Sequence, residues 1–539
     1  MNQAKEYLID PAEGKTIYEI LKSKGVFLDA PCAGRGTCGK CLVYAFGEMT
    51  PLTAEECRVL SKAEIEAGAR LSCQTIPLGQ CRVCLTQKGE MNEMDVVVEG
   101  LGEQLTELKQ AVSRVGDRVY YNGRMIAEAV AAPRLIGFAA DIGTTTVAVY
   151  FYDLETGEQL ATRSGVNRQR SYGADVISRI TCCIENEKAL PELQQAIVSQ
   201  LNGFMESAAE ELQCSKESIV CGVIAGNTTM LHLLEGISPN GIAVAPFTTT
   251  SLFGYDVTAE QLGMNILSSA PIYLTPCVSA YIGGDITAGM AVSPLCSSEK
   301  PCLFIDIGTN GEMALGCRDF IVCCSTAAGP AFEGAHIKQG MSSVPGAINR
   351  VAVVGNDIEV SVIADEKPIG ICGSGLIDAI AVMLKIGAID ETGRLCDDDE
   401  VEEPWDVRLC DEGFCLCNEV LITAQDIREV QLAKASIAAG ISTMLHYKGL
   451  RVDEVDKVYI AGGFGAHINK ESACEIGLLP KELSDRIEFV GNAAGKGASA
   501  CLLSSEVKNL TGKICAKCEY IELSMDAFFR DEYIEMMMF

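Results

Sequence analysis

A short motif, Asp-Ile-Gly-Thr, occurs twice in the 539-residue chain, first from Asp141 and again from Asp306. In both copies an apolar run rich in strand-forming residues precedes the motif and a second one follows it, so each copy predicts a β-hairpin. Two copies of one strand–turn–strand pattern are most economically explained by an internal duplication. We therefore expect two structurally related α/β domains, which is a strong constraint on the fold.

The composition of this turn is suited to binding phosphate. Glycine and threonine offer backbone N–H and hydroxyl donors to phosphate oxygens, and an aspartate can hold Mg²⁺ through water. Two such turns that face each other across a cleft can hold one triphosphate. The classical phosphate loops are absent from the sequence, which contains neither G-x-x-x-x-G-K-[ST] nor a G-x-G-x-x-G placed after a strand.

The repeat resembles the actin, sugar-kinase and Hsp70 superfamily of ATPases. Residues 458–468, VYIAGGFGAHI, are similar to the adenosine motif of that superfamily, in which a strand runs into glycines that leave bare backbone against the base and ribose. The glycines concerned are Gly462, Gly463 and Gly465. Four other glycine-rich segments can line the same cleft or begin helices, and the sequence leaves both readings open: 225–234, 328–337, 370–380 and 491–498.

The chain contains 26 cysteines and has a net charge of −30. Such a charge argues against nucleic acid or an anionic membrane as the main partner.

The first residues lack the pattern of a signal peptide, and no run of about 18 uninterrupted apolar residues occurs, so we expect a cytoplasmic protein. In that compartment the cysteines are expected to be metal ligands, catalytic thiols or small buried hydrophobes rather than disulfides.

Cysteines are concentrated in the first 85 residues. Cys32, Cys38 and Cys41 form C-x5-C-x2-C, and Cys73 follows later, a three-plus-one arrangement that suits a [2Fe–2S] cluster. Glycines between the first three allow the positive φ angles of a loop that wraps a cluster. Zinc is the alternative, with Cys38/Cys41 and Cys81/Cys84 as paired knuckles. Cys57, Cys81 and Cys84 also remain rivals for the fourth position.

The string PCAGRGTCGKC followed by LSCQT resembles a [2Fe–2S] ferredoxin, nearer to the adrenodoxin spacing than to the plant spacing of C-x4-C-x2-C. The stretch AGARLSCQT is similar to the strand that precedes the last ligand in such domains. This similarity favours Cys73 as the fourth ligand.

Residues 88–134 read as a linker between the cysteine-rich segment and the repeat. Within them Leu101, Leu105, Leu108, Val112 and Val115 recur at spacings of four and three, which predicts a helix with one apolar stripe. We expect it to pack within a small linker domain, with a dimer contact as the alternative. The adjacent cysteine pairs 182/183 and 323/324 are expected to be inert packing, and CAKC at 515–518 has too few cysteines for a [4Fe–4S] centre.

The whole arrangement resembles the reductive activators of corrinoid-dependent methyltransferases. The resemblance includes DIGTTT, GADVISRI, AGNTTM, DIGTNGE, AGPAFEGAHI and GICGSGLIDAI. It implies a multidomain α/β and α+β protein: an N-terminal β-grasp ferredoxin-like domain, a small linker domain and duplicated actin-like, ribonuclease H-like ATPase domains. The expected boundaries are 1–87, 88–134, 135–298 and 299–539.

The resemblance also implies a function: ATP-dependent one-electron reduction of a corrinoid protein from inactive Co(II) to Co(I), in a homodimer of an anaerobic host. The implied cofactors are a [2Fe–2S] cluster, ATP and Mg²⁺, and the implied partners are a corrinoid protein and a low-potential electron donor. The implied site residues are Cys32, Cys38, Cys41 and Cys73 for the cluster; Asp141, Gly143, Thr144 and Thr145 for the first phosphate turn; Asp306, Gly308, Thr309 and Asn310 for the second; and Gly462, Gly463 and Gly465 for adenosine.

Two other classes of function fit part of this pattern. The activators of 2-hydroxyacyl-CoA dehydratases use a related ATPase fold, but they hold a [4Fe–4S] cluster between two subunits and lack a ferredoxin domain. A redox-sensing, nucleotide-binding regulator would show no turnover. A sugar kinase fits less well, because phosphorylation of a sugar would not use the predicted iron–sulfur domain.

Overall fold

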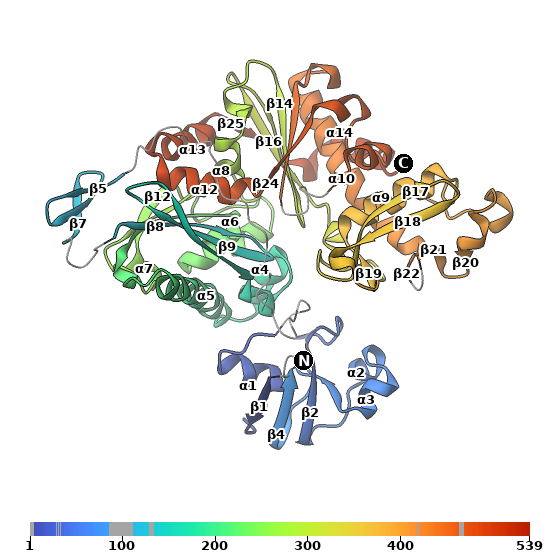
Figure 1. The fold of residues 1–539 in the computed structure, drawn as a ribbon, viewed down its shortest axis with the longest axis horizontal. Helices are drawn as coiled ribbons and strands as arrows, with labels where there is room; N and C mark the ends of the chain where they lie inside the picture. Colours follow the sequence, from blue (N-terminus) through green and yellow to red (C-terminus); the bar gives the residue numbers. More distant parts are fainter. Residues whose placement is uncertain are drawn as a thin grey trace. The chain divides into compact units, whose positions relative to one another are not determined.

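The computed structural model describes residues 5–28, 30, 32, 34–85, 111–128, 134–417, 420–462 and 468–539. The chain divides into two compact units (Figure 1). Unit 1 consists of Met1–Asp285 and Ala498–Lys508, and unit 2 of Ile286–Gly497 and Asn509–Phe539.

Unit 1 begins with a four-stranded antiparallel sheet of order β1-β4-β2-β3. Its strands are β1 (Glu6–Ile9), β2 (Leu42–Met49), β3 (Ala69–Leu71) and β4 (Pro77–Leu85), and its helices are α1 (Ile17–Ser23), α2 (Ala54–Val59) and α3 (Lys62–Glu66). Each helix begins at a capping box, in which a Ser or Thr and a Glu three residues later satisfy each other's backbone N–H groups. Ile17, Leu21, Val43 and Val83 are fully buried in the shared core.

A small three-stranded antiparallel sheet follows, made of β5 (Val112–Val115), β6 (Arg118–Tyr121) and β7 (Arg124–Glu128). The predicted helix is wrong at its C-terminal end, because Val112 and Val115 lie in β5. Asn122 and Gly123 both have positive φ angles and form the β6–β7 turn, and an Asn-Gly pair between strand-forming residues is the usual signal for such a hairpin. Leu101, Leu105 and Leu108 lie outside the described residues.

The main sheet of unit 1 has the order β10-β9-β8-β11-β13-β12. The first three strands are antiparallel, β11 runs parallel to β8, and β13 runs parallel to β11. Strand β8 is almost continuously apolar because it is a buried central strand. The elements are β8 (Ile136–Ile142), β9 (Thr146–Asp153), β10 (Gln159–Val166), η2 (Arg168–Tyr172), α4 (Val176–Glu185), α5 (Ala189–Glu211), β11 (Ile219–Gly226), α6 (Thr228–Glu235), β12 (Tyr255–Thr258), α7 (Ala259–Leu262) and β13 (Pro271–Leu274).

The main sheet of unit 2 repeats this plan, with the order β24-β23-β14-β15-β16-β25. Strands β14, β15 and β16 are antiparallel, β23 is parallel to β14, and β24 is parallel to β23. Five consecutive strands therefore have the same order and directions in both units, as the repeated motif predicts. The strands are β14 (Cys302–Ile307), β15 (Gly311–Gly316), β16 (Ile321–Thr326), β23 (Lys457–Ala461), β24 (Ile487–Gly491) and β25 (Cys518–Tyr520).

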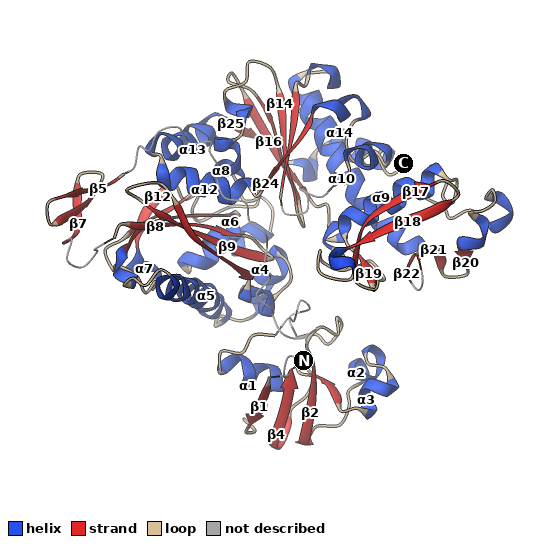
Figure 2. Ribbon diagram, in the orientation of Figure 1, coloured by secondary structure: helices blue, strands red, loops and turns tan. Residues whose placement is uncertain are grey.

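Unit 2 also carries an insertion between β16 and β23 that the sequence did not predict (Figure 2). It contains two small three-stranded sheets, of order β18-β17-β19 and β20-β21-β22. The inserted elements are β17 (Ala347–Val354), β18 (Asp357–Val362), β19 (Gly370–Ile371), α9 (Gly373–Lys385), β20 (Leu409–Cys410), β21 (Gly413–Cys417) and β22 (Val420–Ile422).

Six further α-helices complete the part of the chain that the structure describes. They are α8 (Gly284–Val292), α10 (Ala424–Lys448), α11 (Lys470–Glu475), α12 (Ala493–Leu503), α13 (Ser505–Lys517) and α14 (Ala527–Glu535). In unit 2, α10 packs against β15, β16 and α14. Among the described residues, no helix is both long and apolar enough to cross a bilayer.

Candidate cluster and nucleotide sites

The four cysteines predicted to hold the cluster come together in the N-terminal domain. The Sγ atoms of Cys32 and Cys38 are 3.3 Å apart, as are those of Cys41 and Cys73. Hydrogen bonds from Cys38 and from Cys73 lower the pKa of Cys32, which links the two pairs. Its side-chain contact with Cys73 likewise lowers the pKa of Cys41 to about 7. The same contacts raise the pKa of Cys38 and of Cys73, so in each pair one thiol becomes more acidic and its partner less so. Four thiols gathered from two loops are the donor set of a [2Fe–2S] cluster, and these four fit one.

The loop between α1 and β2 carries three of these cysteines and takes its shape from glycine. Gly36 and Gly39 have φ angles of +72° and +70°, a region that favours glycine. A Cβ atom on Gly39 would lie 2.7 Å from Val59 Cγ1, and one on Gly36 would lie 2.9 Å from Gln74 Cδ. Gln74 Nε2 donates to the Gly34 carbonyl at 2.7 Å and so ties this loop to the one that carries Cys73.

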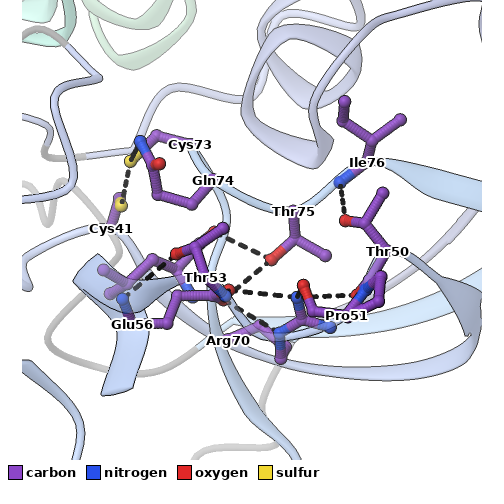
Figure 3. A network of polar contacts seen from close by, with 11 residues as sticks. Cys41, Thr50, Pro51, Thr53, Glu56, Arg70, Cys73, Gln74, Thr75 and Ile76 are labelled. Atoms are coloured by element: carbon purple, nitrogen blue, oxygen red, sulfur yellow. Dashed lines mark hydrogen bonds and ion pairs between the residues drawn. The ribbon is translucent and has the colours of Figure 1, made fainter. Parts of the chain in front are cut away.

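A buried ion pair holds the Cys73 loop from below (Figure 3). Glu56 Oε1 accepts hydrogen bonds from Arg70 Nε at 2.8 Å, from the Leu71 N–H at 3.0 Å and from Thr75 Oγ1 at 3.0 Å. Leu71 and Thr75 flank Cys73, so one carboxylate fixes both sides of the loop. Sequence reasoning missed this network, although the capping box that begins at Thr53 marks Glu56 as a helix-start residue.

The three cysteines that were alternatives to Cys73 as the fourth ligand lie in other environments. Cys57 is exposed, and the thiols of Cys81 and Cys84 donate to the Glu48 carbonyl and to Glu6 Oε1. Cys81 and Cys84 are three residues apart in β4, so their side chains point to opposite faces of the sheet. Cys81 and Cys84 therefore do not form the second knuckle that the zinc alternative requires.

The first phosphate turn joins β8 to β9, with Asp141 at the end of β8. The Gly143 N–H donates to the Thr146 carbonyl at 2.9 Å, and a Cβ on Gly143 would lie 2.9 Å from that oxygen. Other segments of unit 1 contribute three side chains that contact the turn: Asn167 Nδ2 donates to the Gly143 carbonyl at 2.8 Å, Asn227 Nδ2 to Thr144 Oγ1 at 3.0 Å, and Arg179 to the Thr144 carbonyl.

Sequence reasoning missed all three of these side chains as site residues. Asn227 lies in the segment 225–234, directly after β11, and caps α6. Since β11 runs parallel to β8, the ends of both strands meet at the same edge of the sheet. Arg179 lies within GADVISRI, a string that carried the family resemblance without being given a role.

The second phosphate turn joins β14 to β15, with Asp306 in β14. The Gly308 N–H donates to the Asn310 carbonyl at 3.0 Å, and Thr309 Oγ1 donates to Glu333 Oε1 at 2.6 Å. Glu333 belongs to the glycine-rich segment 328–337, which thus contacts the turn.

Gly462, at the end of β23, lies against this turn. It has a φ angle of +94°, and a Cβ atom there would lie 2.7 Å from Asp306 Oδ1 and 2.9 Å from the Ile307 carbonyl oxygen. Gly463 and Gly465 lie outside the described residues.

The other two glycine-rich segments begin helices. In 370–380, Asp378 of α9 is buried and accepts a hydrogen bond from Ser472 Oγ at 2.7 Å. Burial raises the pKa of this carboxyl, in opposition to that hydrogen bond. In 491–498, Asn492 Oδ1 accepts from the Gly495 N–H at the start of α12.

Three family models match the chain in succession. They describe the 2Fe-2S iron-sulfur cluster binding domain at residues 2–78, the RACo middle region at 136–298 and the C-terminal domain of RACo, the ASKHA domain, at 300–539. These matches confirm the predicted fold class and the predicted [2Fe–2S] and ATP cofactors.

Relatives resemble the chain over its length. The corrinoid activation enzyme RamQ of Eubacterium limosum is 30% identical over 98% of this chain and 97% of the relative. A [Co(II) methylated amine-specific corrinoid protein] reductase of Methanosarcina barkeri is 26% identical over 67% of this chain and 68% of the relative. A solved structure described as a reductive activator for corrinoid, iron-sulfur protein is 32% identical, covers 98% of this chain and 96% of its own, and superposes with a TM-score of 0.71.

Proposed function

Because the chain belongs to the RACo family of reductive activators of corrinoid proteins, we propose that it couples ATP to the one-electron reduction of a corrinoid protein from Co(II) to Co(I). The observation that carries this proposal is that one chain combines a four-thiol site with two copies of a phosphate turn. The cluster, when bound, supplies one-electron chemistry, and the turns supply the donors for a nucleotide.

Each predicted site residue has a role in this proposal. Cys32, Cys38, Cys41 and Cys73 bind the cluster. The two turns and Gly462, Gly463 and Gly465 bind ATP, with Asp141 and Asp306 holding Mg²⁺ through water. Catalysis of ATP hydrolysis then rests on positioning and electrostatics, since no step requires a covalent nucleophile. We assign residues 1–87 to the cluster domain, 88–134 to a linker, 135–298 to the first ATPase subdomain and 299–539 to the second.

The need for ATP follows from the energetics of the acceptor. For one electron, each ~60 mV of uphill potential costs about 1.4 kcal/mol, so an acceptor a few hundred millivolts too negative requires several kcal/mol. A nucleotide can supply this only if the protein binds the acceptor differently in its nucleotide states. We propose a corrinoid protein as that acceptor, a low-potential donor for the cluster, a homodimeric assembly and a cytoplasmic location.

The rate of ATP hydrolysis tests whether the protein is an activator that turns over. The anaerobic, cluster-loaded protein is mixed with Mg·ATP and with a corrinoid protein prepared as Co(II) or in its methylated form. We expect the Co(II) form to accelerate hydrolysis, because only that form needs reduction. A rate that is the same with either form, or with none, would instead indicate a nucleotide-binding regulator.

A further inference from the structure

Arg179, in α4, is a fully buried arginine that touches the first phosphate turn. Its Nε donates to the Gly173 carbonyl at 3.0 Å, its Nη1 to Met230 Sδ at 3.0 Å and to Gln169 Oε1 at 3.4 Å, and its Nη2 to the Thr144 carbonyl. Every one of these acceptors is uncharged. The guanidinium is therefore well hydrogen-bonded, but these contacts leave its charge without a counter-ion.

Among the residues that the structure describes, only Asp175 attracts this charge, and its effect on the pKa of Arg179 is smaller than the opposing effects of burial and of Arg170. Asp175, the carboxylate that acts on Arg179, uses Oδ1 to accept the Ser178 N–H at the start of α4 and forms no ion pair with the guanidinium. Burial and the charge of Arg170 lower the pKa of Arg179 to about 9, which still leaves it protonated at neutral pH. A buried cation without a counter-ion is costly, and chains retain one where an anion is to be bound.

The contacts of the turn fix the direction of its peptide groups. The carbonyls of Gly143, Thr144 and Thr145 accept hydrogen bonds from Asn167 Nδ2, from Arg179 and from the Asn167 N–H, respectively. In a planar trans peptide the N–H points opposite to the C=O. The N–H groups of Thr144 and Thr145 are consequently directed away from Asn167 and Arg179, with the positive ends of both dipoles on the far face of the turn.

Holding the turn does not by itself require a cation. Asn167, a neutral amide, donates a hydrogen bond to the Gly143 carbonyl of the same turn. Burying a neutral amide costs less free energy than burying a guanidinium. The side-chain partners of the two turns also differ, because Thr144 Oγ1 accepts from the neutral Asn227 whereas the equivalent Thr309 Oγ1 donates to the carboxylate of Glu333.

We infer that Arg179 is a positioning residue that places a positive charge behind the first phosphate turn, and that the anion it compensates is a polyphosphate. The identification of that polyphosphate as the phosphate chain of ATP rests on the proposed function. Because the charge acts on phosphate and not on the base, its contribution should grow with the number of phosphates in the ligand.

Binding of ATP and of AMP to the full-length protein tests this dependence by calorimetry. We expect Arg179→Met to weaken ATP binding by about tenfold or more and to change AMP binding little, since the loss is that of a charged contact. Arg179→Lys keeps the charge and should recover most of the lost ATP affinity. Equal losses for ATP and AMP, or no rescue by lysine, would mean a merely structural role and would overturn the inference.

A second pair of variants tests the charge without removing Arg179. Met230→Glu places a carboxylate beside the guanidinium, and Met230→Gln is its neutral control. We expect M230E to unfold at a temperature no lower than M230Q, because it pairs a buried charge, yet to bind inorganic tripolyphosphate about tenfold more weakly. Equal tripolyphosphate affinity in the two variants would overturn the inference even if Arg179→Met fails to fold.

Binding of ATP and of tripolyphosphate to the wild-type protein distinguishes a failure of this inference from a failure of the proposed function. If the wild-type protein binds ATP and the M230 variants do not differ, only the role of Arg179 is wrong. If it binds tripolyphosphate in an Arg179-dependent manner but does not bind ATP, the role of Arg179 holds and the proposed function fails.

Discussion

At the scale of single residues, the cysteine spacing together with the resemblance to a [2Fe–2S] ferredoxin predicted which thiols meet. Cys32, Cys38, Cys41 and Cys73 form two pairs with sulfur–sulfur distances of 3.3 Å, and interleaved glycines have the positive φ angles that the loop requires. The supporting residues could not be predicted in the same way. Asn167, Arg179 and Asn227 contact the first turn only because strands and helices distant in sequence bring them there, and no local pattern encodes those contacts.

The assignment of Cys73 as the fourth ligand gives a direct prediction. Cys73→Ala should abolish the [2Fe–2S] cluster, seen as loss of stoichiometric iron and of the EPR signal of the reduced protein, because three thiolates leave one iron site open. Cys81→Ala is the matched control, since Cys81 is also buried in the same domain but bonds to the Glu48 carbonyl. Retention of a full cluster in C73A, or its loss in C81A, would contradict the assignment.

Gly462 gives a second residue-scale prediction. Gly462→Ala would place a Cβ 2.7 Å from Asp306 Oδ1, so we expect the ATP affinity to fall roughly tenfold or more. Gly449→Ala shares the positive φ angle but meets nothing within 4 Å, so it should cost only about 1 kcal/mol of stability and leave ATP binding unchanged. Calorimetric titration of both variants with Mg·ATP distinguishes close contact from backbone strain, and equal affinities would show that Gly462 does not shape the site.

At the scale of secondary-structure elements, prediction worked where local and tertiary signals agreed. The apolar runs around both Asp-Ile-Gly-Thr motifs are strands, and residues 458–461 of the adenosine-like run lie in β23. The prediction was wrong around Val112, where the spacing of apolar residues indicated a helix. The segment is instead strand β5, and the Asn-Gly pair that follows forms the turn between β6 and β7. In the N-terminal domain, Glu56 connects the start of α2 to the Cys73 loop. It is the third residue of the helix and also accepts hydrogen bonds from Arg70 and from the Leu71 N–H.

This double role of Glu56 predicts a large cost for a small change. Glu56→Gln should lower the free energy of unfolding at pH 7 by about 3 kcal/mol, because it leaves Arg70 buried without its partner. Glu19→Gln is the matched control at the same position of an exposed capping box, and it should cost about 1 kcal/mol or less. Urea unfolding, with the exchange of amides in residues 69–76 as a local readout, measures both costs. Equal costs would mean that the buried pair contributes nothing beyond a helix cap.

The pH dependence of that difference follows from the same contacts. Burial raises the pKa of Glu56, but hydrogen bonds from Arg70, Thr53 and Leu71 outweigh it and leave the pKa below the usual 4.5. The stabilisation is therefore fully present above pH 4.5 and is lost only as the pH falls through the lower pKa of the folded state. We expect the difference between wild type and E56Q to be constant from pH 7 to pH 5.5. A difference that shrinks within this range would show that Glu56 is not held as a buried carboxylate.

At the scale of the whole molecule, the repeated motif predicted the architecture. Five consecutive strands of the two main sheets share one order and one set of directions, and the two Asp-Ile-Gly-Thr turns lie at equivalent positions in them. The insertion of β17 to β22 with α9 was not predicted, because its short strands lack a repeat or a motif that separates them from loops. The two copies have also diverged in charge, with Arg179 at the first turn and Glu333 at the second. The two copies of the turn thus have side-chain partners of different charge.

The central claim concerns the joint action of cluster and nucleotide, and one anaerobic experiment tests it. The reconstituted protein, a low-potential reductant and a Co(II) corrinoid protein from the same organism are mixed, and the Co(I) absorption band is followed with and without Mg·ATP. We predict growth of Co(I) only with ATP, and its loss in both Cys38→Ala and Asp306→Ala. Co(I) that forms equally fast without ATP, or a corrinoid protein that stays Co(II) while ATP is hydrolysed, would contradict the account.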